Sequence, residues 1–263
     1  MGIAEKYNLP FLATTPTRRA NKQQVIQAGY DYGANTHASV AHTYKVESKT
    51  KKPGKYMDIM GNKATAYGFI AAAEKAGKRL FLGSYPITPA TDVLHELSKH
   101  KSLGVTTVQC EDEIAGCASS IGASFAGALA VTSTSGPGVC LKSEAMNLAV
   151  ITELPLVILN VQRGGPSTGL PTKSEQTDLL QALFGRNGES PMPVIAATSP
   201  TNCFDAAYYA SKMALEHMTP VVLLTDAFVA NGSGAFKLPD LNDYPDICPP
   251  YVTPEMAGSY TPY

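Results

Sequence analysis

The sequence predicts an α/β protein with a doubly wound, mostly parallel sheet and an N-terminal appendage, and two observations support this fold class. First, short apolar runs alternate with helical stretches six times from Gly61 onward. Second, the apolar runs are bounded by Gly, Pro, Ser or Asn, as buried strands usually are. Because such an alternation leaves room for a crossover helix after each strand, we expect parallel strands with helices on both faces of the sheet.

The predicted elements follow one another at regular intervals. The six apolar runs span 79–82, 105–108, 128–132, 156–161, 194–197 and 221–224. The helical stretches span about 64–76, 91–100, 113–125, 141–151, 174–184 and 201–217.

The chain is expected to contain three segments. Residues 1–56 carry turn formers, basic residues and little periodicity, so they are predicted to be an N-terminal extension and linker, with a turn at 15–19 and a short helix at 23–30. Residues 57–235 hold the regular alternation and form the main domain. Residues 236–263 are expected to be a linker.

Composition narrows the classes of function. The chain has 263 residues, 16% of them charged, and a formal net charge of −1, so nothing favours nucleic-acid binding. The five cysteines are scattered without a Cys-x-x-Cys pair. This argues against a metal or iron–sulfur site held by this chain alone and fits a reducing cytoplasm. No stretch is apolar and long enough to span a membrane. The low charge content fits either an exterior covered by another chain or a large core.

Four of the predicted strands end in polar turns that are rich in Gly and Pro. In an open parallel sheet, ligands bind beyond the carboxyl ends of the strands. All four turns fall on that one edge, so the sequence places the functional chemistry there. The turns span 84–91, 110–113, 133–138 and 162–169.

One of these turns is acidic and opens a helix made mostly of small residues. Asp112 can cap that helix beside a solvated pair formed by Glu111 and Glu113, because carboxylates are stabilised at a helix start. However, a helix with so few large side chains must pack closely, which would desolvate a glutamate in its first turn. The second interpretation is therefore a positioned carboxylate that takes part in proton transfer.

Two further turns offer groups that bind ligands. The 133–138 turn supplies hydroxyls, amides and glycines that permit close backbone approach, although no P-loop or dinucleotide-binding sequence is present. Arg163 stands beside two glycines, where it can either clamp a substrate carboxylate or form a surface ion pair.

Five motifs occur in the order expected of one family. They resemble the alpha subunit of 2-oxoacid:ferredoxin oxidoreductases, particularly the 2-oxoglutarate type, over about residues 57–235. Residues 1–48 resemble the tail of the gamma-type domain that some members carry ahead of alpha, and the chain ends in what resembles the lead into a further alpha-subunit domain. The motifs are GNKATA at 61–66, YPITPAT at 85–91, EDEIA at 111–115, TSGPG at 134–138 and QRGGPSTGLPT at 162–172.

The resemblance implies a pyrimidine-type domain that binds thiamine diphosphate. In this family a glutamate hydrogen-bonds a ring nitrogen of the cofactor, the cofactor attacks the 2-oxo carbon, iron–sulfur clusters take the electrons and coenzyme A takes the acyl group. The Gly-Asp-Gly motif that would hold the diphosphate is missing, and the 225–227 stretch reads as a strand-end turn. We therefore expect the diphosphate, Mg²⁺ and the iron–sulfur cluster on partner chains.

The resemblance also assigns roles to individual residues. Glu113 matches the activating glutamate, with Glu111 as the alternative. Thr88 matches the threonine placed near the substrate, and Arg163 lies in the motif assigned to the substrate carboxylate. The cofactor-binding set is then completed by Tyr85, Pro86, Ile87, Ser135 and Gly136.

The expected function is that of one subunit of a cytoplasmic hetero-oligomer. With a beta-type diphosphate-binding subunit and ferredoxin, it would oxidatively decarboxylate 2-oxoglutarate to succinyl-CoA, or catalyse the reverse carboxylation. The alternatives are the same chemistry on pyruvate or branched-chain 2-oxoacids, or a non-catalytic assembly module with the same fold. A free-standing nucleotide-binding protein is disfavoured because the phosphate motifs are missing.

Overall fold

The computed structural model describes residues 16–36, 47 and 52–261. The chain divides into two compact units, Met1–Met57 and Asp58–Tyr263. The first unit contains α2 (Pro16–Asn35), a helix of 20 residues. The sequence had predicted a turn at 15–19 and a shorter helix at 23–30. The predicted helix is present but longer. The predicted turn was wrong for residues 16–19, which are helical because proline is favoured in the first turn of a helix. Much of the expected linker lies outside the described residues.

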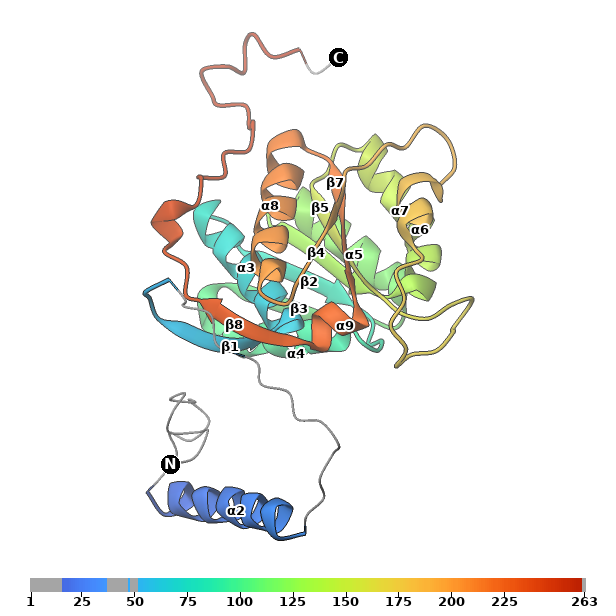
Figure 1. Cartoon of the computed structure of the whole chain (residues 1–263). Coiled ribbons are helices and arrows are strands. Elements are labelled where there is room, and N and C mark those ends of the chain that lie inside the picture. The colour runs from blue at the N-terminus through green and yellow to red at the C-terminus, as the bar shows by residue number, and fades with distance from the viewer. Residues whose placement is uncertain (1–15, 37–46, 48–51, 262–263) are drawn as a thin grey trace. The chain divides into compact units, whose positions relative to one another are not determined.

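The second unit is built on a sheet of six strands that are parallel throughout (Figure 1). The strand order is β3-β2-β4-β5-β7-β6, and each predicted strand is present to within about two residues at either end. The predicted fold class is confirmed. The strands are β2 (Leu80–Ser84), β3 (Val105–Gln109), β4 (Leu129–Thr134), β5 (Leu156–Gln162), β6 (Val194–Ala196) and β7 (Pro220–Asp226).

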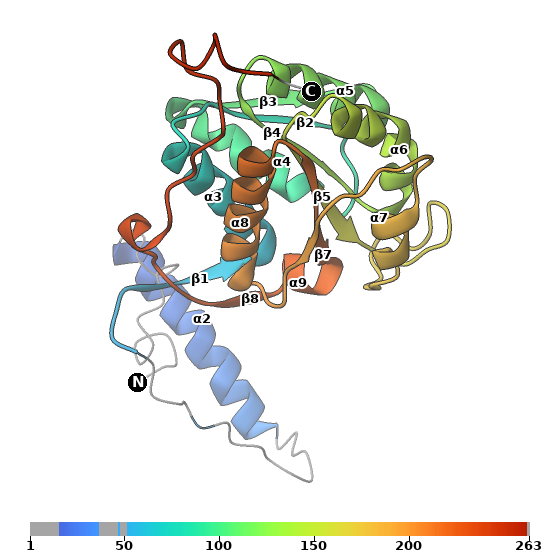
Figure 2. The same cartoon turned by 90° about the horizontal axis from the view of Figure 1, so that it is seen from above.

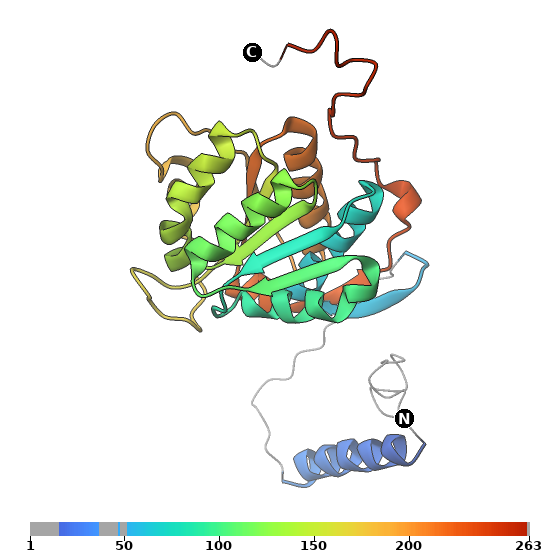
Figure 3. The same cartoon turned by 180° about the vertical axis from the view of Figure 1, so that it is seen from behind.

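Helices cover both faces of this sheet, as Figures 2 and 3 show. One face carries α3 (Gly61–Lys75), α4 (Thr91–Leu97) and α8 (Asn202–His217). The other face carries α5 (Glu113–Phe125) and α6 (Gly136–Ile151). The helices that leave β2 and β4, namely α4 and α6, therefore lie on opposite faces. The carboxyl ends of β2 and β4 flank the point where the winding reverses, which is where ligands bind in such sheets.

Four helix boundaries differ from the prediction. Helix α3 begins at Gly61 and not near residue 64. The predicted helix at 91–100 ends at Leu97 and continues as a 3₁₀ segment, η2 (Ser98–Leu103). Helix α6 begins at Gly136 and not near residue 141, because Pro137 starts a helix well. Helix α7 (Leu179–Phe184) is shorter than the predicted 174–184, since the Asp178 backbone N–H donates to the Gln162 side chain (3.0 Å).

A second, two-stranded sheet was not predicted. It pairs β1 (Tyr56–Met60) with β8 (Ser233–Lys237) (Figure 1). Both strands are mostly exposed, so they lack the apolar runs by which buried strands are predicted. Between β7 and β8 lies α9 (Ala227–Asn231), whose first amides are capped by the Asp226 carboxylate. The predicted turn at 225–227 was wrong, because β7 extends to Asp226 and α9 begins at the next residue.

The segment after β8, expected to be a linker, packs on the domain along its first part. It contains η3 (Leu241–Asp243). Just beyond, the Tyr244 hydroxyl donates to Asp205 of α8 (2.5 Å), and the Tyr208 hydroxyl donates to the Pro245 carbonyl (2.5 Å). Asp246 pairs with Lys75 of α3 (2.7 Å). These contacts tie residues 244–246 to the α3–α8 face.

Close packing fixes α5 on the sheet. A Cβ atom at Gly83 of β2 would lie 2.5 Å from the Gly116 carbonyl of α5, so only glycine fits there. The Ser120 hydroxyl lies 3.2 Å from the Gly83 amide that donates to it, and it donates in turn to the Val131 carbonyl of β4 (2.9 Å). The close approach expected from the small residues of α5 is therefore present, and it sets the position of the first turn of that helix.

Candidate active site

The carboxyl ends of β2 and β4 are joined by buried hydroxyls. Ser84 at the end of β2 donates to the Ser133 carbonyl of β4 (2.9 Å), and the two hydroxyl oxygens lie 2.8 Å apart. Both residues are buried. The switch point of the sheet is therefore a rigid base, and the turns that the sequence singled out extend from it.

The three acidic residues at the start of α5 have different surroundings. Asp112 is exposed, and its carboxylate accepts from the Ala115 amide (2.7 Å), which confirms the expected cap. Glu111 is exposed as well, whereas Glu113 is only 7% exposed. The interpretation of a solvated glutamate pair is therefore wrong for Glu113, because the first turn of α5 faces the neighbouring helix α6.

Glycine at position 138 makes room for the Glu113 carboxylate. A Cβ atom there would lie 2.8 Å from Cγ and 3.1 Å from Oε1 of Glu113, and it would also collide with the Thr134 hydroxyl. The backbone of α6 therefore contacts the glutamate side chain directly. This contact explains why a glycine stands in the first turn of α6 despite the poor helix propensity of glycine.

Within the described part of the chain, the Glu113 carboxylate accepts no hydrogen bond. Two cations contribute to the field around it, because Glu113 acts electrostatically on both Arg163 and Lys142. Buried polar groups in folded proteins are normally hydrogen-bonded. A buried carboxylate without such a partner is typical of a site that receives its partner from a ligand.

The loop after β2 carries the second group of expected site residues. It is closed on itself: the Ile87 amide donates to the Thr91 hydroxyl (2.8 Å), and the Thr91 hydroxyl donates to the Ile87 carbonyl (3.0 Å). Asn62 of α3 anchors it by donating to the Pro89 carbonyl (2.9 Å). Tyr85 and Thr88 are exposed, while Pro86 and Ile87 are half-buried, so this loop presents side chains to the edge of the sheet.

Arg163 joins that loop to the turn after β5. Its Nη1 donates to the Thr88 carbonyl (2.6 Å), and its Nη2 donates to the Thr168 carbonyl (2.7 Å). The side chain is buried and forms no ion pair within the described part of the chain, so the surface-ion-pair interpretation was wrong. Burial lowers the pKa of Arg163, and the negative field of Glu113 opposes that shift. Each terminal nitrogen keeps a second N–H, and the buried Nε has no hydrogen-bond partner among the described residues.

A cavity of about 460 Å³ lies beside these groups. Its walls come from the start of α6, the turn after β5 and the start of α7. Gly136, Arg163 and Asp178 are among the lining residues. The buried Ser135 hydroxyl next to Gly136 has no hydrogen-bond partner in the part of the chain that the structure describes. This edge of the sheet therefore combines a cavity with buried polar atoms that lack a hydrogen-bond partner among the described residues.

Sequence reasoning missed two polar contributors, one half-buried and one fully buried. Asp178 lines the cavity and accepts from Asn160 of β5 (2.9 Å). Lys142 is fully buried in α6. Asn160 gave no signal in a buried strand, but Lys142 stands between Val139 and Met146 on the core side of α6, and a lysine in that register marks an unusual buried charge.

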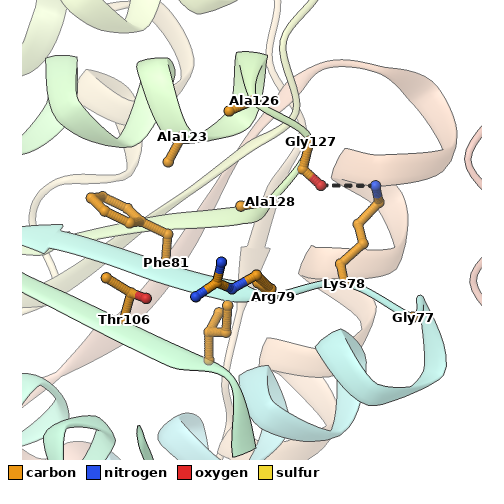
Figure 4. A pocket seen from close by; sticks show the side chains of 10 residues that line it. Gly77, Lys78, Arg79, Phe81, Thr106, Ala123, Ala126, Gly127 and Ala128 are labelled. Carbon is orange, nitrogen blue, oxygen red and sulfur yellow. Dashed lines mark hydrogen bonds between the residues drawn. The ribbon is translucent and has the colours of Figure 1, made fainter.

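A second cavity, of about 420 Å³, lies at the opposite edge of the sheet (Figure 4). It surrounds the amino ends of β2 and β4, where Lys78 donates to the Gly127 carbonyl (3.0 Å). None of the described residues that line it is acidic. The expected site residues all belong to the other edge, so this cavity is not part of the candidate active site.

A doubly wound sheet defines the chain as an α/β cofactor-binding domain when its switch point carries a buried carboxylate to which no described residue donates a hydrogen bond. Residues 72–261 match the model of the pyruvate flavodoxin/ferredoxin oxidoreductase, thiamine diphosphate-binding family. The chain belongs to this family, which confirms the resemblance found in the sequence.

Known proteins support the same assignment. The chain is 55% identical over 238 residues to the 2-oxoglutarate oxidoreductase subunit KorA of Mycobacterium tuberculosis, covering 90% of this chain and 36% of that protein. It is 42% identical over 186 residues to the 2-oxoglutarate synthase subunit KorA of Archaeoglobus fulgidus, covering 70% of this chain and 52% of that protein. The chain thus spans about a third to a half of the length of these relatives.

A solved structure has the same fold. The 2-oxoglutarate:ferredoxin oxidoreductase from Magnetococcus marinus, with 2-oxoglutarate, coenzyme A and succinyl-CoA bound, superimposes with a TM-score of 0.75 at 36% identity. The match covers 85% of this chain and 38% of that chain. None of the helices in the described part of our chain has the length and apolarity needed to cross a membrane.

The residues present fit the cofactor that this family implies. Thiamine diphosphate carries a heterocycle whose ring nitrogens need a hydrogen-bonding partner. The buried Glu113 carboxylate accepts no hydrogen bond from the described residues, and the buried Ser135 hydroxyl has no partner. Both groups belong to the turns that begin helices on the same face of the sheet.

Proposed function

We propose that the chain is the pyrimidine-binding part of a 2-oxoglutarate:ferredoxin oxidoreductase. The reaction converts 2-oxoglutarate and coenzyme A to succinyl-CoA and CO₂, with two electrons passed singly to ferredoxin, or runs in reverse. The observation that carries the proposal is the buried Glu113 carboxylate, which has no hydrogen-bond partner within the described residues and lies against Gly138. The names of the relatives support the choice of 2-oxoglutarate.

In this proposal, Glu113 hydrogen-bonds a ring nitrogen of the aminopyrimidine and holds or gives up a proton at its Oε atoms. When bound, thiamine diphosphate supplies the nucleophilic carbon that attacks the 2-oxo group. Glu113 is largely buried against α6, which keeps most of its side chain away from solvent and favours proton exchange with the cofactor. Glu111, the alternative activating residue, is exposed and lacks this isolation.

Thr88 and Arg163 act on the substrate side. Arg163 holds the backbone of Thr88 in place (2.6 Å), so the threonine hydroxyl is presented from a fixed loop. Its remaining terminal N–H groups suit a carboxylate, because guanidinium and carboxylate match in geometry. Tyr85, Pro86, Ile87, Ser135 and Gly136 form the wall of the cofactor pocket.

The remaining parts of the enzyme come from other chains. A beta-type subunit supplies the diphosphate and Mg²⁺ site and the iron–sulfur cluster, and ferredoxin accepts the electrons in a cytoplasmic hetero-oligomer. The single Asp226 after β7 supports this division, because its carboxylate already accepts from two α9 amides and from Gln176 (2.7 Å). An aspartate engaged in this way does not serve a cation.

The test is to co-express the chain anaerobically with its beta-type partner and to measure viologen reduction that depends on thiamine diphosphate, coenzyme A and a 2-oxoacid. Reduction with 2-oxoglutarate but not with pyruvate supports the proposal. Reduction only with pyruvate or a branched-chain 2-oxoacid overturns the substrate. A complex that holds cofactor and clusters but reduces viologen with no 2-oxoacid shows a different reaction, and a complex that never binds thiamine diphosphate shows an assembly module.

A further inference from the structure

Lys142 of α6 is a buried lysine with an incomplete set of partners. Its side chain has no exposed surface, and its Nζ donates to the Thr132 hydroxyl of β4 (2.6 Å). That is its one hydrogen bond to the described residues, and no carboxylate of that part of the chain lies within ion-pair distance. An ammonium has three donors, and burying a charge is costly unless it is compensated. An apolar side chain would fill this position at lower cost, so the amine needs another explanation.

The position of Lys142 relative to Glu113 follows from the helix geometry. Glu113 and Cys117 are one turn apart on α5, and Gly138 and Lys142 are one turn apart on α6. Residues four apart share a helix face. Because Gly138 contacts the Glu113 carboxylate, Lys142 lies one turn further into the same α5–α6 interface, toward Cys117.

Two threonines of β4, beneath the α5–α6 interface, show the same order, with one next to Gly138 and the other next to Lys142. Thr134 of β4 lies against Gly138, and Thr132 accepts from Lys142. These threonines are two residues apart and therefore point to the same face of the sheet. Lys142 therefore lies beneath the Glu113 side chain and forms no hydrogen bond to the carboxylate oxygens within the described part of the chain.

The other charged groups near Lys142 do not compensate it. On α5, Asp112 is exposed and caps its own helix. Burial raises the pKa of Cys117 to about 11, so this thiol is neutral near pH 7. Burial lowers the pKa of Lys142, and the fields of Cys117, Glu113, Cys110 and Asp112 oppose that shift.

The remaining elements around α6 add no better counter-ion. Glu144, on α6 itself, is exposed. Strands β4 and β5 carry no ionisable side chain within their bounds. On β7 the terminal Asp226 is engaged by Gln176 and two amides. Arg163, after β5, is a cation like Lys142. Glu113 is therefore the buried carboxylate that faces this cation.

We propose that Lys142 is a positioning residue for Glu113, whose buried ammonium holds the neighbouring carboxylate ionised while leaving both carboxylate oxygens free for a ligand. The proposal rests on the proposed function, in which that ligand is the aminopyrimidine. A buried carboxylate without a cation nearby takes up a proton. A direct salt bridge would prevent that uptake but would occupy the oxygens. A cation one helical turn below prevents the uptake without blocking the site.

The test replaces the charge and keeps the bulk, in Lys142→Met. In the cofactor-free complex, the Glu113 carboxyl band is identified by infrared difference against Glu113→Gln, and its titration is followed. We expect the protonated-carboxyl band of Glu113 to persist to higher pH in Lys142→Met than in the wild type. Over the pH range in which the two proteins differ, their dissociation constants for thiamine diphosphate should differ about tenfold. An unchanged titration overturns the proposal.

The matched control is Lys212→Met on α8, which lies on the other face of the sheet and pairs with Glu216. It should leave the titration of Glu113 unchanged. If Lys142→Met does not fold, the same infrared measurement is made on Thr132→Val, which removes the hydrogen bond that holds the Lys142 ammonium. A Glu113 carboxyl band that persists to higher pH supports the proposal, and an unchanged band overturns it. If the wild-type complex never binds thiamine diphosphate, the proposed function fails, and the infrared titration still decides the role of Lys142.

Discussion

Gly138→Ala tests how closely the glutamate site is packed. The new Cβ would start 2.8 Å from Cγ of Glu113, whereas carbon atoms pack at about 3.5–4.0 Å. The glutamate must therefore retreat by about 0.7 Å. A displacement near 1 Å at a reacting group costs about 100-fold, so we expect a loss of turnover of about 30- to 100-fold in the assembled enzyme.

The same substitution should affect stability much less. Overpacking costs about 1–3 kcal/mol, and replacing glycine by alanine inside a helix returns about 1 kcal/mol. The atoms that must move belong to the side chains of Thr134 and Glu113, so the net loss should stay below about 2 kcal/mol. At about 2–4 °C per kcal/mol for a domain of this size, the melting temperature should fall by less than about 8 °C.

Gly122→Ala on α5 provides the matched control. No atom lies within 4 Å of a Cβ at that position, so alanine should raise stability by about 0.5–1 kcal/mol through helix propensity alone. Turnover should stay within about twofold of the wild type. If Gly138→Ala keeps normal turnover and melts like Gly122→Ala, the reasoning about the Glu113 site is refuted.

Three further predictions concern individual side chains. A lysine in Arg163→Lys cannot hold both the Thr88 and the Thr168 carbonyls. Losing one charged hydrogen bond of about 1.5–3 kcal/mol should lower kcat/KM for 2-oxoglutarate at least tenfold. Unchanged kinetics would contradict the role of Arg163 in joining the two turns. Asp112→Ala removes the α5 cap and should cost about 1 kcal/mol in denaturant unfolding with kcat little changed; a loss of kcat like that of Glu113→Gln would contradict its purely capping role. Burial raises the folded-state pKa of Cys117 from 9.0 to about 11, so its stabilising contribution is complete below pH 9 and is lost as the pH rises toward 11. In Cys117→Ala the unfolding free energy should therefore fall less steeply between pH 9 and pH 11 than in the wild type. An unchanged slope would contradict the raised pKa.

The sheet could be predicted from the sequence because its strands are apolar runs between turn residues. Strands β4, β5 and β7 are buried at every position, and each begins with an apolar run that marks it as a strand even though polar residues follow toward its carboxyl end. The exposed strands β1 and β8 could not be found in this way, because their pairing depends on a contact between residues far apart in the chain. The start of α6 was missed because Gly136-Pro137-Gly138 reads as a turn, although proline also begins helices.

The location of the site could be predicted more easily than its details. The four turns lie together at one edge of the sheet, as predicted, because parallel strands bring their carboxyl ends together. Spacing alone did not separate Glu111 from Glu113; the difference is burial against α6, which depends on packing between helices. The backbone partners of Arg163 depend on packing and could not be read from the sequence. The burial of Lys142 could have been inferred from its register between Val139 and Met146 on α6.

The central claim is that Glu113 is the group that binds the aminopyrimidine of thiamine diphosphate. The most direct measurement is calorimetric titration of thiamine diphosphate into the assembled complex, with Glu113→Gln compared with Glu111→Gln. We predict that Glu113→Gln loses at least tenfold in affinity and all measurable turnover, while the exposed Glu111→Gln stays within about twofold of the wild type in both. Equal affinities for the two variants, or a loss confined to Glu111→Gln, would contradict the claim.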